Sequence, residues 1–145
     1  MSEITRQIGI SACNTAIIKR LKEDANTIAY VAKIFNNVPT GTAMPYLHVT
    51  GYMDRPSAMF GSRDFAPEDV SFAVHVWSGS LGDKDCADIM NLVTKALTNS
   101  ALAITGYTTN FNASLDFADI LIDTTEPLTP VRHGVCRFIL RVSPN

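Results

Sequence analysis

The clearest pattern in the chain is the alternation of apolar and other residues from Asp69 to Gly79. One face of an extended strand would carry four large apolar side chains, those of Val70, Phe72, Val74 and Val76. The opposite face would carry Ser71, Ala73, His75 and Trp77. A period of two, with β-branched and aromatic residues, is typical of a sheet strand that is packed on at least one side. We therefore expect this segment to be the central strand of a sheet.

Two segments repeat apolar residues at helical spacing instead. The first runs from about Glu3 to Asp24, with Ser2 as its expected cap and an apolar stripe formed by Ile10, Cys13, Ile17, Ile18 and Leu21. The second runs from Asp83 to Thr98, with a cap expected from Asp83 or Asp85 and a stripe formed by Cys86, Ile89, Met90, Val93, Ala96 and Leu97. A single short helical turn is expected at residues 26–30.

Four further segments have strand character, namely Lys33–Asn36, Tyr46–Tyr52, a stretch within Tyr107–Asp123, and Gly134–Val142. In the third of them, alternation predicts a common face for Phe111, Ala113, Leu115 and Phe117. Strands that follow one another across loops, without intervening helices, favour antiparallel pairing. We therefore expect an α+β fold, a mostly antiparallel four- to five-stranded sheet with two main helices packed on one face. Residues 1–145 would form one domain.

Residues 53–68 show no periodicity and are expected to form a long loop. Its large apolar and cationic side chains make it a candidate subunit or partner interface: Arg55, Met59, Phe60, Arg63 and Phe65. Loops of this length are usually functional or flexible. Two interpretations stay open, a lid folded back on its own sheet and a segment that orders against a neighbouring protein. A second polar loop is expected at residues 123–132.

The charge balance and the cysteines narrow the possible functions. With 145 residues and a formal charge of −2, the chain lacks the concentrated basic patch of a general nucleic-acid binder. Three scattered cysteines suggest reduced, buried thiols and synthesis in the cytoplasm. We find no apolar run of membrane-spanning length and no apolar core of a signal peptide at the N-terminus, so we expect no membrane association.

A search for catalytic or ligand-binding patterns finds none. His48, His75 and His133 are far apart in sequence, and the cysteines form no C-x-x-C pair of the kind that holds a metal. No complete nucleophile elbow or phosphate loop is present. We therefore expect no enzyme activity, no metal and no cofactor, and an interaction or assembly role fits the chain better.

Several landmarks occur in a recognisable order along the chain. They are the N-terminal helix, Lys33-Ile-Phe-Asn36, Met44-Pro45-Tyr46, His75-Val-Trp77-Ser78, the helix ending near Leu97, and Arg132-His133-Gly134-Val135. In their order and spacing, from about residue 5 to residue 142, the chain resembles the tail-terminator (tail-completion) proteins of long-tailed bacteriophages and related tail-like particles. The resemblance implies that six residues are positions of the fold and take no part in chemistry: Pro45, Tyr46, Trp77, Ser78, His133 and Gly134.

The same resemblance implies a structural virion protein that forms a hexameric ring on the end of the tail tube. There the ring would stop tube polymerisation and form the tail side of the head–tail joint. Its partners would be further copies of itself, the tail-tube protein and the head–tail connector or stopper protein, and DNA would pass through without specific binding. The location would be the tail end at the neck of the virion, after assembly in the bacterial host cytoplasm.

Two alternatives stay open from the sequence. One is another neck component, a head-completion or connector-adaptor protein. The other is a small cytosolic ligand-binding domain or enzyme, in which His75, His133 and a cysteine would converge under the segment 53–68. If that segment is an assembly surface instead, Phe60→Asp is expected to weaken assembly and leave the monomer folded.

Overall fold

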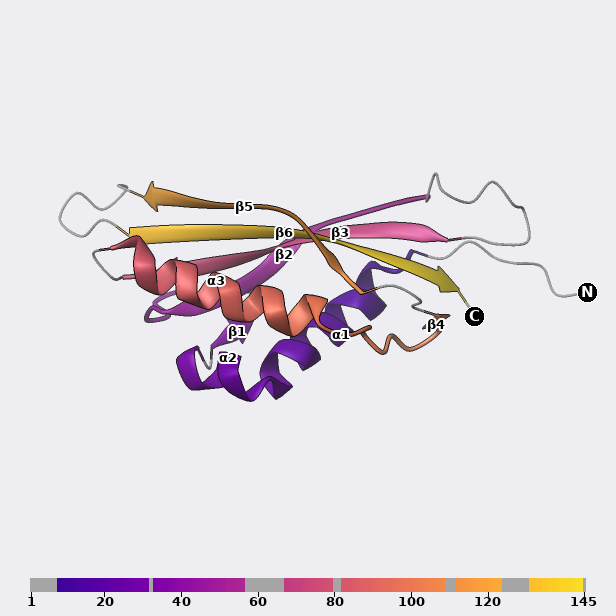
Figure 1. The fold of residues 1–145 in the computed structure, drawn as a ribbon, viewed down its shortest axis with the longest axis horizontal. Coiled ribbons are helices and arrows are strands. Elements are labelled where there is room, and N and C mark those ends of the chain that lie inside the picture. Colours follow the sequence, from indigo (N-terminus) through magenta and orange to yellow (C-terminus); the bar gives the residue numbers. More distant parts are fainter. Residues whose placement is uncertain are drawn as a thin grey trace, which may run out of the picture.

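In a computed structural model, residues 8–31, 33–56, 67–79, 82–108, 112–123 and 131–144 are described. Its helices are α1 (Ile10–Glu23), α2 (Ala25–Tyr30) and α3 (Asp83–Thr98). Its strands are β1 (Ile34–Phe35), β2 (Tyr46–Pro56), β3 (Glu68–Ser78), β4 (Tyr107–Thr108), β5 (Ser114–Asp123) and β6 (Val131–Pro144). Figure 1 shows the long strands side by side, with β5 along one margin of the sheet.

The six strands form one sheet in which β3 is central. The order is β1-β2-β3-β6, and β6 then pairs with both β5 and β4. All pairs are antiparallel except β1 with β2, which is parallel. The expected α+β fold with a mostly antiparallel sheet is thus confirmed, and the short parallel pair makes the sheet mixed.

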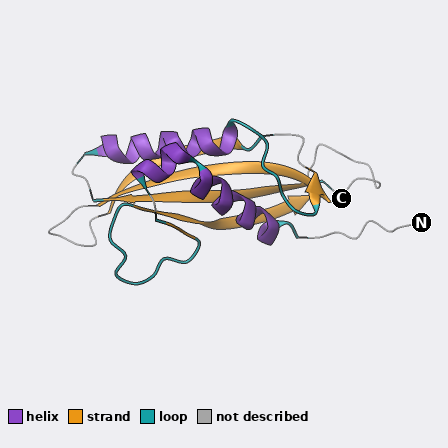
Figure 2. Cartoon of the chain, turned by 90° about the horizontal axis from the view of Figure 1, so that it is seen from below, coloured by secondary structure: helices purple, strands orange, loops and turns teal. Residues whose placement is uncertain are grey.

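The core lies between one face of this sheet and the helices, and Figure 2 shows the helices along one side of the strand layer. The expected apolar face of β3 is entirely buried: Val70, Phe72, Val74 and Val76 each have 0% exposure. Opposite them, β6 contributes Cys136, Phe138, Leu140 and Val142. The rings of Phe72 and Phe138 stack at 5.4 Å between centroids. Burial of these side chains is the dominant favourable term for the fold.

Gly134 explains how α3 can lie so close to β6. A Cβ atom at this position would be 2.6 Å from Met90 Sδ and 2.8 Å from Cys86 Sγ, both on α3. These distances are shorter than normal van der Waals contact, so any larger residue would require the side chains of Met90 and Cys86, or the helix itself, to move. The structure therefore gives a packing reason for one of the six positions expected to support the fold.

Helix α1 begins later than predicted, and helix α3 has a different cap from the one expected. Helix α1 begins at Ile10 and not near Glu3, because Gly9 occupies the cap position and its N–H donates to Asp54 Oδ2 on β2 at 2.9 Å. The expected cap, Ser2, lies outside the described residues. Helix α3 covers the predicted range, but its cap is Gly82, without a side-chain hydrogen bond. Asp83 instead accepts a hydrogen bond from Arg132 Nε at 2.6 Å.

Strand pairing also takes residues that were expected in loops. Residues 53–56 extend β2 because they pair with 68–71 on β3, beyond a register shift between Thr50 and Met53. Gly51, with φ +71°, lies inside this bulge, where its conformation is accessible to glycine. Likewise, residues 131–132 belong to β6, where they pair with β5.

The predicted common face of β5 is wrong. A register shift between Leu115 and Phe117 places Leu115 opposite Phe138 and Phe117 opposite Arg137. Phe138 is on the helix-covered face and Arg137 on the other, so the two apolar residues of β5 lie on opposite faces. Such a bulge inserts one extra residue and shifts the alternation by one. Phe111 lies outside the described residues.

Candidate functional surfaces

The sheet face away from the helices carries a row of stacked rings across three strands. Tyr46 on β2 stacks on Trp77 of β3, at 6.3 Å and 26° between ring planes. Trp77 stacks in turn on His133 of β6, at 3.9 Å and 10°. The strand register places these residues directly opposite one another. Such cross-strand aromatic pairs stabilise a sheet, so three of the six expected fold positions act together.

Two of the three histidines meet on this same face. His75 Nδ1 lies 2.7 Å from His133 Nε2, so the N–H of one ring donates a hydrogen bond to the nitrogen of the other. Burial, and then the positive charges of His133, His48 and Arg137, lower the pKa of His75 from 6.5 to about 4. His75 is therefore neutral near pH 7. Arg137 donates to Gly51 O and Ser71 Oγ, each at 3.2 Å, which fixes its charge to the strands.

The cysteines do not join these histidines. Cys13, Cys86 and Cys136 are free thiols, all buried, and they lie in the core on the helix-covered side. Burial raises the pKa of Cys13 to about 12 and that of Cys136 to about 11. A thiol with so high a pKa is a poor nucleophile. The convergence of His75, His133 and a cysteine that the enzyme alternative requires does not occur.

A second group of titratable side chains lies where β2 ends and β3 begins. Glu68 is 3% exposed. This burial, followed by a hydrogen bond to Asp54 and the negative charge of Asp54, raises the pKa of Glu68 to about 7. A hydrogen bond from Tyr107 acts in the opposite direction. Glu68 Oε1 has no hydrogen-bond partner within the described part of the chain, and a Cβ atom on Gly9 would approach it to 2.7 Å. This group joins the start of α1 to three strands.

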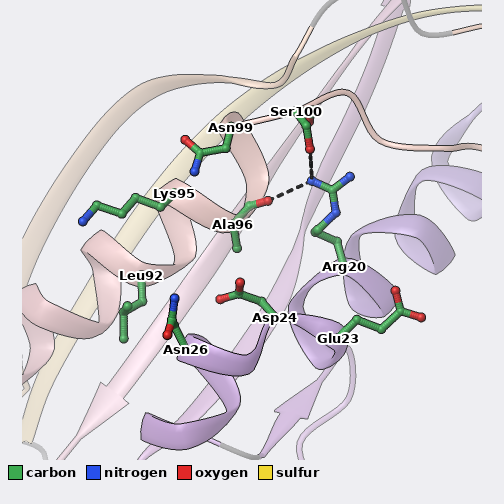
Figure 3. Close-up of a pocket in the computed structure, with 9 residues that line it drawn as sticks. All are labelled: Arg20, Glu23, Asp24, Asn26, Leu92, Lys95, Ala96, Asn99 and Ser100. Carbon is green, nitrogen blue, oxygen red and sulfur yellow. Dashed lines mark hydrogen bonds between the residues drawn. The ribbon is translucent and has the colours of Figure 1, made fainter.

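The crevice between α1, α2 and α3 has a volume of about 420 Å³ and is shown in Figure 3. Its most prominent cation, Arg20, donates from Nη1 to Ala96 O at 3.0 Å and to Ser100 Oγ at 3.1 Å. Its Nη2 donates to Ala101 O at 2.9 Å. Arg20 thus satisfies carbonyl groups at and beyond the C-terminal end of α3. We interpret the crevice as a helix junction.

Strand β5 is the most exposed apolar element of the described residues. Eight large apolar side chains in the described part of the chain are exposed, and half of them belong to β5: Leu115 (43%), Phe117 (50%), Leu121 (48%) and Ile122 (57%). On one side β5 pairs with β6, and the sheet ends at its other side. A long apolar edge strand of this kind is a template for pairing with another chain.

Strand β5 was not among the predicted interface residues, because its alternation is typical of any sheet strand. A usable signal was present in the interleaved carboxylates Asp116 and Asp119, which suit a strand face in water. Of the predicted interface residues, Arg55 is exposed at the end of β2, where Nη2 contacts Met53 Sδ at 2.8 Å. The others, Met59, Phe60, Arg63 and Phe65, lie outside the described residues.

The remaining expected fold positions lie around the end of the sheet where β2 begins. Pro45 follows a cis peptide bond and is exposed, while Ser78 is 3% exposed at the end of β3.

Among the described residues, no three histidine, cysteine or acidic side chains are grouped so that they could hold a metal ion. Within those same residues, no helix has the length and apolar character needed to cross a membrane.

Comparison with known proteins places this fold. Residues 15–143 match the family described as tail completion protein gp17. The chain belongs to this family. The family assigns it a structural role in a phage tail, which the resemblance of the ordered landmarks had implied. The fold is also that of a chain in a structure titled "Virion of native gene transfer agent (GTA) particle", with a TM-score of 0.82 and 18% sequence identity. That match covers 95% of this chain and 99% of the other. No curated protein matches.

Proposed function

We propose that this tail completion protein is a tail terminator. It forms a ring, hexameric as the family resemblance implies, on the end of the tail tube, stops tube polymerisation and forms the tail side of the head–tail joint. The observation that carries the proposal is the family match over residues 15–143. The shared fold with a chain of a gene transfer agent virion supports it.

The geometry supports an assembly role over a catalytic one. A cyclic ring is built from heterologous contacts, so each subunit must offer two different surfaces. Strand β5 offers an exposed apolar edge of the kind that one such contact needs. In contrast, the paired histidines lie on the sheet face opposite the buried thiols. We propose that the segment predicted at residues 53–68 contributes to a partner contact through Arg55, Met59, Phe60, Arg63 and Phe65.

The proposed partners are further copies of this chain, the tail-tube protein and a head–tail connector or stopper protein. DNA passes through the ring without specific binding. Consistent with this, the described arginines are engaged in contacts with the protein itself, as Arg141 is with Asp69 at 2.8 Å. The proposed location is the tail end at the neck of the virion, after assembly in the host cytoplasm.

The test is the molar mass of the purified protein, measured by light scattering after size exclusion, with and without the tail-tube protein, followed by negative-stain imaging. We expect six-fold rings, free or on tube ends. A protein that stays monomeric and leaves tube length unchanged would overturn the proposal. Binding to the connector side without any effect on tubes would favour another neck component, a head-completion or connector-adaptor protein.

A further inference from the structure

The exposed side of β5 combines apolar side chains with negative charge. Its helix-side face carries Leu115 and Ile122, and its other face carries Phe117 and Leu121, by their register with β6. Two exposed carboxylates, Asp116 and Asp119, lie between them. The strand contains no lysine or arginine. A partner for β5 must therefore offer apolar surface beside positive charge.

A groove with that complementary character lies at the opposite margin of the same chain. It has a volume of about 650 Å³ and is bounded by α1 and β1. Its apolar lining comes from Ile18, Ile34 and Phe35, and its rim carries the exposed cations Lys19 and Lys22. Of the described residues that line it, Glu23 is acidic, and its carboxylate lies 4.0 Å from Lys19 Nζ.

The positions of the two surfaces decide what kind of assembly they can make. In the sheet order, β1 is the first strand and β5 lies beyond β6, so the groove and the strand are at opposite ends. Figure 1 shows β5 along one margin and β1 near the other. Two different, complementary surfaces at opposite ends of one subunit produce head-to-tail contacts, which close into a ring when the rotation allows it.

We propose that β5 of one copy occupies the α1/β1 groove of a second copy. In this contact Phe117 and Leu121 meet the partly exposed Ile18 and Phe35, while Asp116 and Asp119 face Lys19 and Lys22. Charge complementarity and placement at opposite margins identify a second copy of this chain as the occupant. The inference rests on the proposed ring and names the surfaces that build it.

Charge reversal provides a test with an internal rescue. The strand variant is Asp116→Lys with Asp119→Lys, and the groove variant is Lys19→Glu with Lys22→Glu. All four side chains are exposed, so each variant is expected to fold, which circular dichroism and thermal unfolding can verify. In either variant alone, like charges face each other across every contact. We expect the protein concentration for half-assembly, measured by light scattering, to rise at least tenfold.

Mixing the two variants in equal amounts should restore assembly. In a ring where they alternate, every strand meets a groove of opposite charge, and a six-membered ring can alternate throughout. We expect the mixture, and the chain carrying all four substitutions, to form rings near the wild-type concentration. As a matched control, Tyr30→Asp changes an exposed apolar residue (55%) outside both surfaces and should leave assembly unchanged.

The outcomes separate this inference from the proposed function. If the wild type never forms rings, with or without tubes, the proposed function fails. If the wild type forms rings and the groove variant does so equally well, the ring stands and this contact is wrong. Assembly of the groove variant together with loss in the strand variant would indicate that β5 meets a different surface, either another β5 or the tube protein.

Discussion

Strands β3 and β5 have similar patterns of apolar and polar residues but opposite environments. Both run for ten or eleven residues and place large apolar side chains among polar ones. Phe72 on β3 has 0% exposure, whereas Phe117 on β5 has 50%. The reason is position: β3 pairs on both sides and is covered by helices, while β5 pairs only with β6 at the margin.

The comparison teaches that the same alternation can serve folding in one strand and assembly in another. On β3, the apolar residues lose their contact with water when the chain folds. On β5, they keep that contact until another surface covers them, so the free energy of their burial remains available for binding. A pair of matched substitutions distinguishes the two uses.

The largest expected contrast is between Phe72→Ala and Phe117→Ala. We expect Phe72→Ala to lower the free energy of unfolding by about 3–5 kcal/mol, because it leaves a cavity in a packed core. Phe117→Ala should change it by no more than about 0.5 kcal/mol, as for exposed positions in general. Urea unfolding at a concentration where the protein is monomeric measures both. Equal losses would mean that Phe117 is part of the monomer's core, and would contradict the contrast between β3 and β5.

The next largest expected effect concerns the packing of α3 against β6 on the helix-covered face of the sheet. Gly134→Ala introduces a Cβ atom against Met90 and Cys86, so α3 must shift or Met90 must adopt another rotamer. Overpacking of this kind costs about 1–3 kcal/mol of unfolding free energy. Gly79→Ala is the control, since its nearest contact would be Met44 Cε at 4.0 Å. A variant as stable as this control would show that the α3–β6 contact adapts freely.

The smallest expected effect concerns the carboxyl group at the start of β3. Because the folded state raises the pKa of Glu68 from 4.5 to about 7, it binds the proton more tightly than the unfolded chain does. The wild type should therefore lose stability as the pH rises from about 4.5 to 7. Glu68→Gln keeps a donor toward Asp54 and cannot ionise. At pH 8 its free energy of unfolding should therefore exceed that of the wild type.

Below pH 4.5 the advantage of Glu68→Gln should disappear, because Glu68 is then protonated in both states. Denaturant titrations from pH 4 to pH 8 test this, and the difference between the two proteins removes any contribution from His75. Asp119→Asn, on the exposed strand, controls for the change in net charge. A constant difference across this range would exclude Glu68 as the source of the pH dependence.

The sequence determined those parts of the protein that depend on local periodicity. The alternation from Val70 to Val76 located the central strand, and the helical repeat from Cys86 to Leu97 located α3, because each pattern fits only one backbone period. The ordered landmarks were sufficient to suggest the family. The sequence also identified Tyr46, Trp77 and His133 as expected positions of the fold, although it did not show that their rings stack.

Tertiary structure decided which surfaces remain open. The carboxylates beside Phe117 hint at an exposed strand, but they do not settle its burial. Burial depends on how many neighbours a strand has, and that is set by pairing between distant residues. The bulge that separates Leu115 from Phe117 is likewise a property of the β5–β6 register. The Gly9–Asp54 contact at the start of α1 joins residues 45 positions apart. The sequence thus determined which elements form, and only their assembly determined which of them is left available for a partner.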